Sequence, residues 1–226
     1  MHFDRRTFIK NMAISGCTIV CYSYLGGTFL PSAHASKQKN TFAGIVANHL
    51  KCTGCRTCEC VCSSYNHKEN IAGESLPGLG NPYFSNIQVT SFNPDIDVPT
   101  VCALCPDAPC VNACPVEPDE NGEKAMYRNK ALGIVKCHID RCIGCGSCKE
   151  ACKSQSVGII RSNQKTNVPE RMCTLCYGTP QCVKHCPYHA LSHVKIEIDS
   201  PFYRLSQELV AEKLMAKWYY MQQRGE

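Results

Sequence analysis

Four groups of four cysteines constrain this chain more than any other feature of its sequence. Each group holds a C-x2-C pair, then a third cysteine after a gap of two to five residues, then a fourth after a gap of three. Group by group, the sixteen cysteines are Cys52, Cys55, Cys58 and Cys62; Cys102, Cys105, Cys110 and Cys114; Cys142, Cys145, Cys148 and Cys152; and Cys173, Cys176, Cys182 and Cys186. The fold must therefore gather these side chains at a few common centres.

The spacing within the groups indicates iron–sulfur ligation. Groups one and three have the spacing of bacterial ferredoxins, and groups two and four lengthen only the gap before the third cysteine. A cubane offers four iron corners to thiolates, and one tight loop reaches three of them when cysteine recurs every third residue. The fourth cysteine lies on the following helix and points towards a second cluster. Gly54 and Gly144 give two of the loops the freedom that they need. The sequence predicts four [4Fe–4S] clusters.

Disulfide bonds and zinc sites are the other common uses of clustered cysteines. Twenty cysteines in 226 residues approach the density of a disulfide scaffold, but cysteines separated by two residues seldom reach the geometry of a mutual bridge. Zinc ribbons use C-x2-C pairs two to a site, without the four-cysteine groups seen here.

Of the remaining cysteines, Cys17 and Cys21 fall in the N-terminal segment. Cys60 and Cys137 are expected to be small buried residues, with replacement of a lost ligand as the alternative.

The first 35 residues have the order of an export signal. Arg5 and Arg6, followed by Thr-Phe-Ile-Lys, resemble a twin-arginine motif, an apolar run follows, and residues 33–35 form an A-x-A cleavage site. That route carries folded proteins, which suits a chain loaded with clusters in the cytoplasm. We expect a periplasmic location or one on the outer face of the cytoplasmic membrane. The alternative is a retained leader that anchors the chain, although its Ser and Gly residues make it a weak spanning helix.

The composition argues against nucleic-acid binding and against catalysis. The formal net charge is +5, but no basic stripe with interleaved aromatic residues accompanies it. We find no nucleophile–base pair, no Gly-rich phosphate loop and no pterin-binding domain. A cluster with four cysteine ligands leaves no open position for a substrate. The sequence therefore predicts a non-catalytic electron-transfer protein.

The pattern of elements predicts an α+β fold made of two ferredoxin-like dicluster halves with loop inserts and a C-terminal helix. Strands are expected at 42–47, 87–92, 134–139, 157–161 and 194–198, and short helices at 58–65 and 148–154. The segment 72–82 is expected to be a surface loop or a partner contact, and the polar insert 116–130 to end in a hairpin.

The domain boundaries follow from these patterns. We place an export signal at 1–35, a four-cluster domain at 36–199 and an amphipathic helix at 200–226. Leu205, Leu209 and Leu214 recur at helical intervals in this last segment. The helix is expected to fold back on the cluster domain, with docking to a partner subunit as the alternative.

The second group carries a resemblance to a known family. The stretch Cys102-Ala-Leu-Cys105-Pro-Asp-Ala-Pro-Cys110-Val-Asn-Ala-Cys114-Pro115 is similar to the second motif of the four-cluster subunits of molybdenum and tungsten bis-pterin oxidoreductases. Such subunits occur in dimethyl sulfoxide reductase, polysulfide reductase and formate dehydrogenase. The resemblance implies a molybdenum- or tungsten-pterin catalytic subunit as partner, and a quinone-linked membrane subunit or a cytochrome subunit as a possible second one.

The resemblance covers about residues 43–198, and it also implies how the clusters share their ligands. In the family the fourth cysteine of each motif crosses to another cluster, so that the group at 52–62 pairs with that at 173–186, and the group at 102–114 with that at 142–152. The implied ligand sets are Cys52, Cys55, Cys58 and Cys186 for cluster 1; Cys102, Cys105, Cys110 and Cys152 for cluster 2; Cys142, Cys145, Cys148 and Cys114 for cluster 3; and Cys173, Cys176, Cys182 and Cys62 for cluster 4.

Two choices stay open in the sequence. The first is the subfamily: the short gap before Cys182 and the leader resemble those of the small partners of aldehyde-oxidoreductase-type enzymes. The second is the role: the chain is either a subunit of a complex or a free-standing exported polyferredoxin. Lys51, Arg141 and Lys149 lie beside ligands, where they either raise a local potential or are ordinary surface charges.

Overall fold

The computed structural model describes residues 41–71, 74–77 and 80–223, which lie within one compact unit, Lys39–Glu226. The predicted export signal at 1–35 lies outside the described residues. Within the described part of the chain, none of the helices combines the length and the apolar character needed to cross a membrane.

The strands are short and pair two by two. They are β1 (Thr41–Ala47), β2 (Lys68–Ile71), β3 (Glu74–Pro77), β4 (Ile87–Asn93), β5 (Ile96–Val101), β6 (Met126–Arg128), β7 (Val135–Cys137), β8 (Arg161–Ser162), β9 (Pro169–Glu170) and β10 (Leu191–Glu197). The antiparallel pairs are β1–β10, β2–β3, β4–β5, β6–β7 and β8–β9. Four of these pairs are local, whereas β1–β10 joins the two ends of the cysteine-bearing region.

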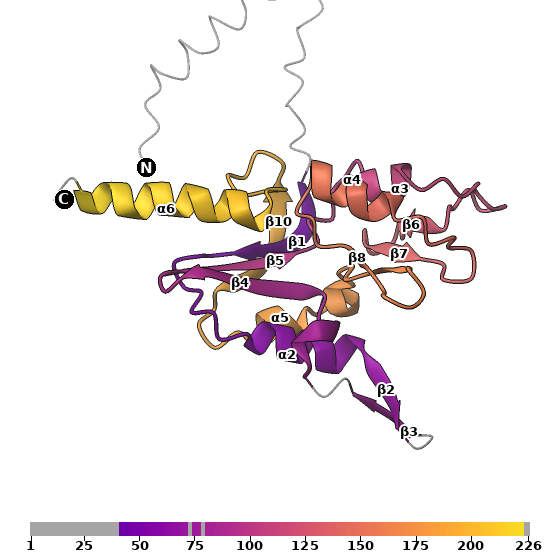
Figure 1. Ribbon diagram of the computed structural model, residues 1–226, viewed down its shortest axis with the longest axis horizontal. Coiled ribbons are helices and arrows are strands. Elements are labelled where there is room, and N and C mark those ends of the chain that lie inside the picture. The colour runs from indigo at the N-terminus through magenta and orange to yellow at the C-terminus, as the bar shows by residue number, and fades with distance from the viewer. Residues whose placement is uncertain (1–40, 72–73, 78–79, 224–226) are drawn as a thin grey trace, which may run out of the picture. The chain divides into compact units, whose positions relative to one another are not determined.

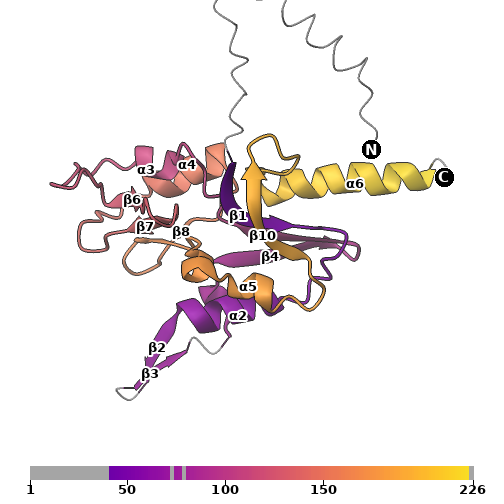
Figure 2. The same ribbon diagram turned by 180° about the vertical axis from the view of Figure 1, so that it is seen from behind.

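The helices lie beside the cysteine groups. They are α2 (Thr57–Asn66), α3 (Pro109–Asn112), α4 (Ser147–Gln155), α5 (Gln181–Lys184) and α6 (Gln207–Gln223), with 3-10 turns η1 (Pro82–Phe84) and η2 (Leu175–Gly178). Helix α2 packs with α5, and α3 packs with α4; both views show these as two separate helix pairs (Figures 1 and 2). The mixture of helices and small sheets confirms the α+β class.

Helix α6 lies against β5. Val210, Ala211 and Leu214 on the helix are buried together with Ile96 and Val98 on the strand. Burying these apolar side chains removes them from water, which stabilises the contact. The helix is therefore folded back on the rest of the unit, as the first of the two sequence alternatives expected.

The structure confirms the strands expected at 42–47 and 87–92, and the hairpin at the end of the polar insert, where β6 pairs with β7. The strand expected at 157–161 is wrong except for its last residue. Gly158 has a φ of 70°, which takes the chain out of the extended conformation. Ile159 and Ile160 are instead buried in the core.

Two further expectations need correction. The segment 72–82 is not only a loop, because residues 74–77 form β3 and pair with β2. In the strand expected at 194–198, Ile196 is buried but Val194 is 45% exposed. The two-stranded sheet β1–β10 is covered over only part of its length, so alternating apolar residues there do not all reach a core.

Candidate iron–sulfur sites

All four cysteine groups begin with the same backbone turn. The residue two positions after the first cysteine has a positive φ in every group: 64° at Gly54, 50° at Leu104, 67° at Gly144 and 49° at Leu175. This left-handed conformation costs a residue with a side chain about 1–2 kcal/mol. The glycines were visible in the sequence, but Leu104 and Leu175 were missed. Aligning the four sequence groups on their first cysteine would have placed both leucines at the position of the two glycines.

Each group continues into a short helix that starts one residue before its third cysteine. Helices α2, α3, α4 and α5 begin at Thr57, Pro109, Ser147 and Gln181. Cys62 and Cys152 lie within α2 and α4, one helical turn after the third cysteine of their group and on the same side. Cys114 and Cys186 lie two residues beyond the ends of α3 and α5. The third cysteine can therefore face the loop of its own group, while the fourth faces the next centre along the helix.

Three hollows inside the unit are each lined by four cysteines. Site 1 has Cys52, Cys55, Cys58 and Cys186; site 2 has Cys102, Cys105, Cys110 and Cys152; site 4 has Cys62, Cys173, Cys176 and Cys182. In every case three cysteines belong to one group and the fourth comes from another. These memberships equal the ligand sets that the sequence resemblance implies for clusters 1, 2 and 4.

Site 3 is the remaining set, Cys114 with Cys142, Cys145 and Cys148. Cys114 and Cys148 lie in one buried cluster. Cys137 packs against the same cluster. Burial, followed by the charges of Cys142, Cys148 and Cys114, raises the pKa of Cys137 to about 12. Cys145 is exposed, and its Sγ lies 3.4 Å from the hydroxyl of Ser147.

Two buried clusters indicate that the sites follow one another in the order 1, 4, 2, 3. One cluster holds cysteines of sites 1 and 4, the other holds cysteines of sites 2 and 3, and Cys102 of site 2 packs against both. At three of the cysteines whose pKa is raised by burial, a cysteine of another site adds to the rise: Cys182 of site 4 acts on Cys58 of site 1, Cys102 of site 2 on Cys173 of site 4, and Cys148 of site 3 on Cys110 of site 2. Charges at neighbouring sites therefore interact electrostatically. The two end sites hold the exposed cysteines Cys55 and Cys145.

Amide groups point at several of the sulfur atoms. The backbone N–H groups of Asn86, Leu175 and Ala190 donate to Cys62 Sγ at 3.3 Å, Cys173 Sγ at 3.4 Å and Cys186 Sγ at 3.2 Å. The side-chain amide of Asn66 lies 3.5 Å from Cys62 Sγ and 3.8 Å from Cys176 Sγ. Such donors stabilise a thiolate. Asn66 was missed in the sequence, although it lies one helical turn after Cys62.

Burial raises the pKa of eight of the sixteen thiols, which opposes their ionisation in the absence of metal. It raises the pKa of Cys102 to about 11 and that of Cys182 to about 12. The exposed Cys55 and Cys145 behave oppositely, since the hydroxyls of Thr57 and Ser147 lower their pKa. Because ligation needs the thiolate, loading of the buried sites releases protons and is opposed by acid.

The donor sets fit an iron–sulfur cluster. Four thiols surround each of sites 1, 2 and 4, and most of the other lining residues are apolar. Every cysteine of the described residues is a free thiol, which counts against a disulfide scaffold there. Across the same residues, no three His, Cys, Asp or Glu side chains converge on a single metal ion.

The charged residues beside the ligands and the additional cysteine Cys60 lie near the sites without joining a four-cysteine set. Arg141 donates to the Asp119 carboxylate at 2.9 Å and to the Glu123 carbonyl at 2.8 Å, so it fastens the polar insert. Lys51 lines site 1 from an exposed position, and Lys149 is half-buried. Cys60 is half-buried on α2 and lines none of the three hollows.

Comparison with known proteins places the chain among electron carriers. It is 37% identical over 154 residues to the polyferredoxin-like subunit of an aliphatic sulfonate oxidoreductase from Pyrococcus furiosus, covering 68% of this chain and 76% of that protein. It is 36% identical over 161 residues to the electron transport protein HydN of Escherichia coli, covering 65% and 85%. The iron–sulfur subunit of E. coli formate dehydrogenase-O is 31% identical over 208 residues, covering 84% and 61%.

The chain therefore belongs to the ferredoxin-like iron–sulfur electron transport proteins. No protein-family model matches it. A chain of the BamBC complex of benzoyl coenzyme A reductase aligns over 79% of this chain and 93% of its own length, at 23% identity and a TM-score of 0.35. That likeness is too weak to support a conclusion.

Proposed function

We propose that this chain is the iron–sulfur subunit of an exported oxidoreductase complex and that it carries four [4Fe–4S] clusters. The observation that carries the proposal is the membership of sites 1, 2 and 4, in which each hollow is lined by three cysteines of one group and one of another. This arrangement suits the crossed ligation of ferredoxin-like dicluster halves. Cys114, Cys142, Cys145 and Cys148 supply the fourth set.

Electron transfer through the chain follows the order of the sites. Each cluster, when bound, accepts and returns one electron without binding a substrate. The protein's own groups fix the thiolates, donate amide hydrogens to sulfur and keep water from the inner sites 4 and 2. Sites 1 and 3 are the ends, and their exposed ligands Cys55 and Cys145 are the places where electrons arrive and leave.

A catalytic partner subunit is consistent with the relatives. One is named a subunit of an aliphatic sulfonate oxidoreductase and another a subunit of formate dehydrogenase-O. Together with the second-motif resemblance, these names favour a molybdenum- or tungsten-pterin subunit at one end and a second redox partner at the other. The twin-arginine-like residues Arg5 and Arg6 support export of the folded chain.

A free-standing exported polyferredoxin is the second candidate. An exposed apolar face on the C-terminal helix would have counted against it, because obligate subunits cover such surfaces. In the structure Val210, Ala211 and Leu214 of α6 are buried against β5 within the chain itself. The helix therefore gives no ground for rejecting a diffusible carrier.

Anaerobic affinity purification of the natively expressed full-length chain, with metal analysis of each fraction, separates the two candidates. We expect a larger subunit to co-elute, with molybdenum or tungsten in constant proportion to iron. N-terminal sequencing of the same material should start at residue 36, and the protein should be found outside the cytoplasm. An iron-rich chain that elutes alone would favour the free carrier, and a colourless chain that contains zinc would contradict both.

A further inference from the structure

Site 2 receives a buried hydrogen-bond donor from outside its own ligand loops. The hydroxyl of Ser156 lies 3.1 Å from Cys105 Sγ, and both residues are buried. A ligating Cys105 is a thiolate and can only accept, so the hydroxyl must donate. Reduction adds negative charge to a cluster, and a donor to its sulfur stabilises the reduced form. This contact therefore shifts the potential at site 2 in the positive direction.

The segment before α6 covers the same site. The Arg204 guanidinium donates to both carboxylate oxygens of Asp107, at 2.9 and 3.0 Å, and to the carbonyl of Gln155 at 2.8 Å. Asp107 follows Cys105 by two residues, and Gln155 immediately precedes Ser156. Arg204 thus fastens the C-terminal segment across the two pieces of chain that enclose site 2.

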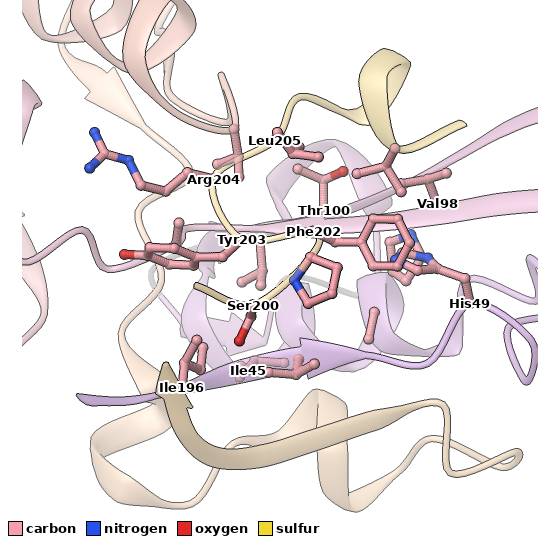
Figure 3. Close-up of a pocket in the computed structure, with 18 residues that line it drawn as sticks. Ile45, His49, Val98, Thr100, Ile196, Ser200, Phe202, Tyr203, Arg204 and Leu205 are labelled. Carbon is pink, nitrogen blue, oxygen red and sulfur yellow. The ribbon is translucent and has the colours of Figure 1, made fainter. Parts of the chain in front are cut away.

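Tyr203 is held by this clamp with its hydroxyl buried. That hydroxyl has no hydrogen-bond partner among the described residues, and a buried unpaired hydroxyl is costly. Burial raises the pKa of Tyr203, and Cys105 makes the next largest contribution. Tyr203, Arg204 and His49 line an apolar pocket of about 260 Å³, but the hydroxyl points to the Arg204 side and away from His49 (Figure 3). The Tyr203 hydroxyl therefore lies on the side of the pocket where Arg204 is found.

A fixed positive charge completes these surroundings. The Arg128 guanidinium donates to the carbonyl of Leu104 at 3.0 Å and also to that of Cys105. None of the ion pairs found among the described residues involves Arg128. Its charge is therefore not neutralised by a nearby carboxylate, and it stabilises added electron density at site 2.

Site 1 is surrounded by charges of both signs. Glu59, next to the ligand Cys58, is only 3% exposed, and its carboxylate accepts from the backbone N–H of Val89 at 2.6 Å. The Asp97 carboxylate packs against Gly54 in the ligand loop. Lys51 and Arg56 also line this site, and the Arg56 guanidinium lies 3.9 Å from the Glu59 carboxylate. The carboxylates there are thus balanced in part by positive charge, although Glu59 itself opposes the addition of an electron.

We propose, on the basis of the four-cluster function above, that the Ser156 hydroxyl makes the midpoint potential of the site 2 cluster more positive than it would be without this donor, and that Ser156 is a positioning residue for electron transfer. Electron transfer at this site would move no proton and would form or break no bond.

The test is an EPR-monitored redox titration of the purified, iron-loaded full-length protein. Ser156→Ala is expected to move one midpoint potential to a more negative value and to leave the other three in place. Ser156→Thr keeps the hydroxyl and should keep the wild-type midpoint. Glu59→Gln, which retains the acceptor for Val89, should move a different midpoint to a more positive value.

Ser147→Ala is the matched control. Its hydroxyl also approaches a ligand sulfur, but at the exposed Cys145, where water takes its place, so no midpoint should shift. Unchanged midpoints in Ser156→Ala at full iron content would overturn the inference, as would a shift of the same midpoint by Ser156→Ala and Glu59→Gln. A wild-type protein without four reducible clusters would instead refute the proposed function on which the inference rests.

Discussion

Replacing Cys114 with Ser should remove or alter the cluster at site 3 and spare the one at site 2. Cys114 belongs by sequence to the second group, yet Cys110 of that group lines site 2 together with Cys152 and without Cys114. Loss of one thiolate commonly costs a cluster or one of its irons. We expect iron to fall by up to about a quarter, the share of one cubane in four.

Spectra of matched variants identify which cluster is lost. The EPR spectrum of reduced Cys114→Ser should match that of Cys148→Ser and differ from that of Cys110→Ser. Because Cys137 adjoins site 3, it can replace the missing ligand, so the double variant Cys114→Ser/Cys137→Ser should show the full loss. Cys60→Ser, a half-buried non-ligand on α2, serves as control and should change nothing. A Cys114→Ser spectrum that matches Cys110→Ser would contradict the crossed ligation.

Removal of iron should unfold most of the described unit. The ligand cysteines are themselves core residues: one buried cluster includes Cys58, Cys62, Cys173 and Cys182, and another includes Cys110, Cys114, Cys148 and Cys152. Helices α3 and α5 have four residues each, too few to be stable alone. Without the metal centres, little apolar surface is left to offset the entropy of ordering the chain.

Far-UV circular dichroism before and after anaerobic chelation measures this effect. We expect a large loss of helical signal and its recovery on reconstitution with iron and sulfide. The contact of α6 with β5, formed by Val210, Ala211 and Leu214 with Ile96 and Val98, contains no ligand. It should keep the longest amide protection in hydrogen exchange. An apoprotein with unchanged ellipticity and a cooperative thermal transition would show that the metal does not hold the fold.

The local parts of the sites were predictable from the sequence because they depend on spacing. The turn at Gly54 and the helix that carries Cys58 and Cys62 follow from residues only a few positions apart. Strand β5 was missed because Pro99 interrupts its pattern. A proline is tolerated there because β5 pairs with β4 alone and has a free edge.

Contacts between distant residues were not predictable from spacing. Ser156 reaches Cys105 across 51 positions, and Asn66 reaches Cys176 across 110. The membership of each four-cysteine set is also a long-range property, and only the resemblance to a family implied it. Tyr203 and Arg204 fall in a segment read as part of a helix, whereas α6 begins at Gln207 and leaves both residues free to cover site 2.

The most direct test of the central claim is the iron and acid-labile sulfide content of the anaerobically purified chain, combined with Mössbauer spectroscopy. We predict about sixteen irons and about sixteen sulfides per chain, with all of the iron in [4Fe–4S] cubanes. Zinc in place of iron, or about half of this iron content in a fully folded protein, would contradict the assignment of four clusters.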